Sequence, residues 1–82
     1  MAELIQTYTE VVRDSRGEEF VVSAHGEERA DGTWEGWVEF RPAAGDVRRT
    51  GRETTQPHRE ALRYWASGLE PVYLQGAFAR AS

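Results

Sequence analysis

Apolar and polar residues alternate along two stretches near the middle of the chain. In residues 20–25 (FVVSAH) and 34–40 (WEGWVEF), every second position is apolar or glycine. A period of two is typical of a β-strand with one buried face. Trp37 falls on the face opposite Phe40, together with charged neighbours. The face expected to be buried consists of Trp34, Gly36, Val38 and Phe40.

Turn residues separate the extended stretches. Asp31-Gly32 lies between the two alternating stretches and predicts a hairpin there. Residues 47–54 (VRRTGRET) are expected to form a polar last strand with a bulge at Gly51. Residues 5–13 are β-branched and aromatic but have a mixed period, so they fit a strand or a short helix. We favour the strand.

Helical spacing begins after these strands. Thr54 and Thr55 are expected to cap the main helix, and Pro57 suits its first turn. A second, short helix is expected over residues 71–81 (PVYLQGAFARA). The buried stripe of the main helix consists of Leu62, Trp65, Ala66 and Leu69. The predicted fold class is therefore α+β in a single domain, residues 1–82: an antiparallel three- to four-stranded β-meander, covered on one face by a main α-helix plus a short C-terminal helix.

The composition limits the compartment. The chain has no cysteine, so it has no disulfide framework, which fits a reducing cytoplasm. The first ten residues lack the basic region and the apolar run of a signal peptide. No apolar stretch is long enough to span a membrane. We therefore expect a cytoplasmic protein with no membrane partner.

Charge is distributed unevenly along the chain. Residues 1–40 hold ten acids and three arginines, a net of −7, whereas residues 41–63 hold six arginines and three acids, a net of +3. Arg59 and Arg63 are neighbours on the predicted helix and, with Arg52, can form a positive surface for a phosphate or a carboxylate. The alternative is that these arginines pair with nearby acids. The acidic first half would repel a nucleic-acid backbone.

Trp37 allows two interpretations. A large aromatic side chain on a face with charged neighbours can be a binding anchor. It can equally pack under the N-terminal segment or under an arginine such as Arg49. A homodimer through this face is a further alternative, because a two-layer fold leaves the outer sheet face open.

Signatures of catalysis and metal binding are absent from the sequence. There is no Gly-x-Ser-x-Gly motif, no phosphate loop and no His-Glu-x-x-His. The two histidines, His25 and His58, have no metal-ligand spacing with the acids. Ser23 has no evident base. We therefore expect no enzyme activity, no cofactor and no metal, and a structural role for His58 where helix and sheet meet.

Two resemblances cover parts of the chain. Residues 33–81 resemble a set of small bacterial proteins that share Trp-Glu-Gly-Trp, then Arg-Glu-Thr-Thr-Gln, then Tyr-Trp-Ala; this set has no assigned function and implies none. A looser similarity to HicB-type antitoxins rests on residues 50–54 (TGRET) followed by residues 60–62 (EAL). The chain lacks that family's Pro-x-Leu-x-Gly loop, and no DNA-binding segment follows. By analogy, the similarity implies a partner-binding module rather than an enzyme.

These features favour a small non-catalytic interaction or regulatory module. Its expected contact surfaces are the outer sheet face with Trp37 and the helix edge with Arg59 and Arg63. Its partner is expected to be another protein or a second copy of the chain. The alternative is a nucleic-acid-binding protein that uses residues 41–63, whose binding would weaken steeply with salt.

Overall fold

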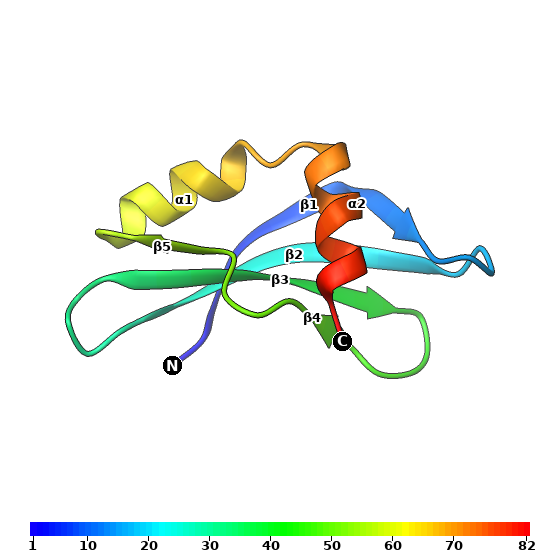
Figure 1. Cartoon of the computed structure of the whole chain (residues 1–82), viewed down its shortest axis with the longest axis horizontal. Helices are drawn as coiled ribbons and strands as arrows, with labels where there is room; N and C mark the ends of the chain where they lie inside the picture. The colour runs from blue at the N-terminus through cyan, green and yellow to red at the C-terminus, as the bar shows by residue number, and fades with distance from the viewer.

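Two helices lie against one face of an antiparallel sheet in the computed structural model, which describes residues 1–82 (Figure 1). The sheet runs in the order β1-β2-β3-β4, and the short strand β5 also pairs with β3. The elements are β1 (Glu3–Arg13), β2 (Glu19–Glu28), β3 (Trp34–Pro42), β4 (Arg48–Arg49), β5 (Thr54–Gln56), α1 (Arg59–Ser67) and α2 (Pro71–Arg80). The predicted α+β class is confirmed, and the segment 5–13 is a strand.

Strands β2 and β3 form a regular hairpin. Their pairing runs without a register shift from Phe20 opposite Pro42 to Glu28 opposite Trp34. Gly32, with a φ of 88°, lies in the connecting turn where the Asp-Gly signal predicted it. The inward face of both strands enters the core, as the alternation predicted, except that Trp34 at the start of β3 is only partly buried and lies outside the core cluster. The core cluster includes Phe20, Val22, Ala24, Val38, Phe40, Ala66, Leu74 and Ala77.

Strand β1 is an edge strand and is irregular. Its pairing with β2 shifts register between Leu4 and Gln6 and again between Thr7 and Val11. The hydroxyl of Tyr8 donates a hydrogen bond of 2.6 Å to the backbone oxygen of Ala66 in α1. This bond ties the edge strand to the helix layer 58 residues further along the chain.

The segment after β3 differs from the single bulged strand that we predicted. Two short strands, β4 and β5, pair separately with β3. Thr50 lies between β4 and β5 and bonds to β3 there. Its Oγ1 accepts from the Val38 amide at 3.1 Å, and its own amide donates to the Val38 oxygen at 3.0 Å. The buried Thr50 hydroxyl thus replaces a ladder partner where the strand is interrupted.

The main helix begins later than predicted. Thr54 and Thr55 lie in β5 rather than in a cap, and α1 begins at Arg59. The N-cap is His58, whose Nδ1 accepts a hydrogen bond of 3.2 Å from the Ala61 amide. Thr54 and Thr55 cannot cap the helix because they pair with β3 as part of β5. The imidazole nitrogen of His58 caps the helix instead.

The second helix, α2, begins at Pro71 as the sequence predicted and ends at Arg80. Glu53, at the edge of the sheet, holds it in place. A carboxylate oxygen of Glu53 accepts from the Tyr73 hydroxyl at 2.5 Å and from Arg80 at 2.6 Å. Neither α1 nor α2 is long and apolar enough to cross a membrane.

Helix α1 approaches the sheet over two glycines. Gly26 and Gly36 face each other across β2 and β3. A Cβ atom at Gly26 would lie 2.3 Å from a Leu62 methyl group, and one at Gly36 would lie 2.7 Å from the other. Leu62 is fully buried on this platform. The absence of side chains at both positions lets the helix pack this closely.

Candidate interaction surface

The sheet face away from the helices is open (Figure 1). Its side chains come from alternate residues of the three long strands and from β4. In the register, Val11 lies opposite Val21, and Leu4 lies opposite His25. Leu4, Val11 and Val21 are 56%, 40% and 50% exposed. Three of the seven exposed large hydrophobic residues therefore lie on this open face.

Trp37 lies at the centre of the open face but is only 2% exposed. The guanidinium of Arg49 covers its ring at 4.2 Å from the ring centre. Its indole Nε1 donates a hydrogen bond of 3.0 Å to a carboxylate oxygen of Glu39. Trp37 thus packs under an arginine and is not an exposed ring. It contributes to the surface through the charged groups that enclose it.

A histidine joins the same group. His25 lies opposite Trp37 in the register, and the two rings stack at 6.3 Å with an interplanar angle of 15°. His25 Nε2 lies 2.9 Å from Ser23 Oγ and 3.5 Å from Glu39 Oε1. Ser23 therefore has a neighbouring base, contrary to our expectation. We call Ser23, His25, Trp37, Glu39 and Arg49 the central cluster.

The central cluster does not have the geometry of a catalytic triad. In a triad, the serine and the acid contact different nitrogens of the imidazole. Here both contact Nε2 of His25. Neither pocket of the structure is lined by these residues. Desolvation by burial lowers the pKa of His25, against the raising effect of Glu39 and in the same direction as Arg41 and Arg49.

The three arginines predicted as a positive surface are not joined by any shared contact. Arg59 donates to Glu3 of β1, with its Nε at 2.8 Å from Glu3 Oε1. This hydrogen bond is the main cause that lowers the pKa of Glu3 and raises that of Arg59. Arg52 and Arg63 are exposed and form no ion pair. The guanidinium of Arg48 lies over the ring of Phe20 at 5.0 Å and is also engaged.

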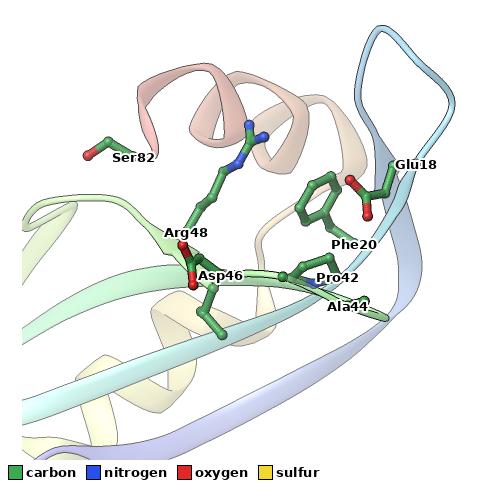
Figure 2. Close-up of a pocket in the computed structure, with 9 residues that line it drawn as sticks. Glu18, Phe20, Pro42, Ala44, Asp46, Arg48 and Ser82 are labelled. Carbon is green, nitrogen blue, oxygen red and sulfur yellow. The ribbon is translucent and has the colours of Figure 1, made fainter.

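A cavity of about 390 Å³ lies beside the turn between β3 and β4. Figure 2 shows the side chain of Arg48 extending toward α2 within it. Phe20 contributes an apolar wall, and Glu18 and Asp46 contribute carboxylates. One arginine with two acids leaves the cavity without a dominant charge. A second, shallow depression of about 380 Å³ between β1 and α1 is lined by Ile5, Gln6, Glu60, Arg63, Tyr64 and Ser67.

No family model, no curated protein and no solved structure matches the chain. Neither the Trp-Glu-Gly-Trp resemblance nor the similarity to HicB-type antitoxins is supported by these comparisons. The function therefore has to be inferred from the surface itself.

Sequence reasoning placed Trp37 on the open face and offered Arg49 as a cover for its ring, which the structure confirms, but it did not bring Ser23, His25 and Glu39 together. The signal was present: the Asp31-Gly32 turn fixes the β2–β3 register, and that register sets His25 opposite Trp37 and Ser23 opposite Glu39. Arg49 follows from the pairing of β4, in which it lies opposite Glu39. The sequence of β4 alone does not predict this pairing, because two polar residues show no alternation of apolar and polar positions.

Proposed function

We propose that this chain is a small non-catalytic interaction module that holds a protein partner on the open face of its sheet. The observation that carries the proposal is the composition of that face. Exposed aliphatic side chains lie around a central cluster whose members are already hydrogen-bonded and stacked. The lack of cysteine supports a reducing cytoplasm as its place of action.

The aliphatic side chains supply the driving force in this proposal. Leu4, Val11 and Val21 are each about half exposed. Complete burial of such a side chain stabilises by about 1.5–3 kcal/mol, so covering the exposed half contributes roughly 1 kcal/mol for each residue. The central cluster adds little entropic cost on binding, because its side chains are ordered beforehand.

Nucleic acid is the less favoured ligand. Of the arginines in residues 41–63, Arg59 is paired with Glu3, while Arg48 and Arg49 lie over aromatic rings. The chain carries a net charge of −4. A nucleic-acid interface would need a continuous positive surface. Because these three arginines already contact other side chains, fewer positive groups remain to form such a surface.

The proposal is tested with three tagged baits: the wild type, Val21→Glu and Val72→Glu. Val72 is 80% exposed on α2, away from the sheet, so it is a matched control for a surface valine replaced by a charge. Each bait is incubated with a lysate of the cells in which the protein naturally occurs, with and without nuclease. Bound proteins are quantified by mass spectrometry. Circular dichroism verifies that all three baits are folded.

The proposal expects a protein that the wild type and Val72→Glu retain in both nuclease conditions and that Val21→Glu loses. That protein can be an untagged copy of the chain. Equal retention by all three baits would contradict the use of the open face. Retention only without nuclease would favour nucleic acid instead.

A further inference from the structure

We infer that the partner on the open face is a second copy of this chain, packed face to face with its strands antiparallel. The inference rests on the proposed function, because it uses the same face. It adds the identity of the partner and the direction in which the partner lies. Two observations carry it: the placement of charge along the face, and the size of the face.

Opposite charges lie at opposite ends of the open face. At one end Arg41 is exposed, lies opposite Val21 and has no ion pair. At the other end Glu27 lies directly opposite Glu35. Like charges in such a cross-strand pair are destabilising. Glu35 pairs with Arg29 at 3.3 Å and Glu27 pairs with the Met1 terminal ammonium at 3.0 Å, each through Oε2 alone. The second carboxylate oxygen of each acid is left to accept from an external cation.

Arg41 and Glu35 both lie on β3, six residues apart, which is about 20 Å along a strand. One possible two-fold axis lies in the plane of the interface, perpendicular to the strands. It places β3 of one copy over β3 of the other copy, and the two strands run in opposite directions. Each Arg41 then approaches the Glu35 end of the other copy. Along β1, the same operation brings Leu4 toward Val11. In this arrangement the charged side chains of one copy approach opposite charges of the other copy, and the aliphatic side chains of the two copies approach each other.

The other two-fold arrangement is less favourable. An axis parallel to the strands would set β3 over β1 with both strands in the same direction. Arg41 would then face the Val11 end of β1, and Glu35 would face the Leu4 end. Arg41 would be buried against aliphatic side chains without a partner, which is costly, and Glu35 would gain no cation beyond Arg29. The charge distribution therefore selects the antiparallel dimer.

The open face is large enough for a stable interface. The molecule is 41 Å long and 18 to 22 Å across. A standard protein interface buries about 800 Å² on each partner. Two sheets pack face to face at about 10 Å, with their side chains interdigitated. A dimer of this kind would be a four-layer α/β/β/α sandwich in which both helix layers lie outside.

The test is sedimentation velocity over a range of concentrations, for the wild type and charge variants. The wild type is expected to sediment as a dimer of twice the 9.3 kDa chain mass. Arg41→Glu is expected to weaken the dimer at least ten-fold, and Arg41→Glu with Glu35→Arg to recover most of this loss. Arg63→Glu is the matched control, since it makes the same charge change on α1 and should leave the dimer unchanged.

The direction of packing has its own readout, because the chain has no native cysteine. Leu4→Cys and Val11→Cys proteins are mixed and treated with a bis-maleimide that spans about 10 Å, the distance between packed sheets. The antiparallel dimer predicts more cross-links between the Leu4→Cys protein and the Val11→Cys protein than between two copies of the Val11→Cys protein. An excess of such same-site cross-links would overturn the antiparallel direction.

A wild type that remains monomeric at every concentration would overturn the inference. If Val21→Glu still lost a different captured protein, the proposed function would survive that result with another partner. A dimer that responds equally to Arg41→Glu and Arg63→Glu would also overturn the inference, because it would not depend on this face.

Discussion

The guanidinium of Arg49 lies 4.2 Å from the centre of the Trp37 ring, on the sheet face that the helices leave open. The largest side chain of that face is therefore enclosed within the isolated chain. Glu39 fixes its indole nitrogen and lies near His25 on the neighbouring strand. An ordered polar centre with exposed aliphatic side chains around it distinguishes this face from a uniformly solvated one.

Replacement of Arg49 tests this enclosure. Arg49→Ala is expected to destabilise the chain by about 1 kcal/mol, the value of a partly desolvated cation–π contact, and to expose Trp37. Arg49→Lys should keep only part of the stability that Arg49 contributes, because an ammonium group lacks the planar stacking surface. Urea unfolding measures the stability, and the indole N–H resonance of Trp37 reports the exposure. An unchanged resonance in Arg49→Ala would contradict the account.

The glycine platform under Leu62 gives a second prediction. A Cβ at Gly36 would lie 2.7 Å from Leu62, 3.1 Å from Thr54 and 3.2 Å from Trp65. Gly36→Ala is therefore expected to destabilise the fold by about 1–3 kcal/mol through overpacking. Gly51→Ala is the control, because no heavy atom lies within 4 Å of its Cβ position. Thermal unfolding of both variants checks this, and equal melting temperatures would refute close packing by α1.

Thr50 predicts a third effect, on the interrupted edge of the sheet. Thr50→Val keeps the shape of the side chain but removes the acceptor of the Val38 amide. A buried donor without a partner costs about 1–3 kcal/mol. Thr55→Val, on the exposed side of β5, removes a hydroxyl that makes no hydrogen bond and should change little. Urea unfolding midpoints of the two variants measure the difference, and equal midpoints would exclude a structural role for the Thr50 hydroxyl.

The pH dependence of stability follows from His25. Desolvation lowers its pKa in the folded chain below the ordinary value of 6.5. As the pH falls through about 6.5, the unfolded chain binds a proton that the folded chain resists. Stability should therefore be full above this pH and fall below it, toward the lower folded pKa. Unfolding at pH 7.5 and pH 5.5 should show a larger loss for the wild type than for His25→Gln. An equal loss would exclude His25 as the cause.

The sequence predicted the long strands well because burial imposes a period of two on β2 and β3. It also placed Trp37 on the outer face. It failed over residues 47–58, where β4 and β5 have two and three residues and cannot show a period. Thr54 and Thr55 have the chemistry of a cap, yet β3 holds them as a strand.

The partners of the arginines were also beyond sequence reasoning. Arg59 pairs with Glu3, 56 residues away, because β1 lies beside α1 in the fold. An acid close in sequence, Glu60, has no ion pair. Proximity along the chain predicts ion pairs poorly when strands from distant segments adjoin a helix.

The most direct test of the central claim is the rate of thiol labelling at the open face in living cells. Val21→Cys and Val72→Cys each introduce a single cysteine into a chain that has none. The two valines are 50% and 80% exposed in the isolated chain, so both thiols should react readily in dilute purified protein. In cells, a covered face predicts slow labelling at Val21→Cys and fast labelling at Val72→Cys. Labelling of both at the rates of the dilute protein would contradict the use of this face for interaction.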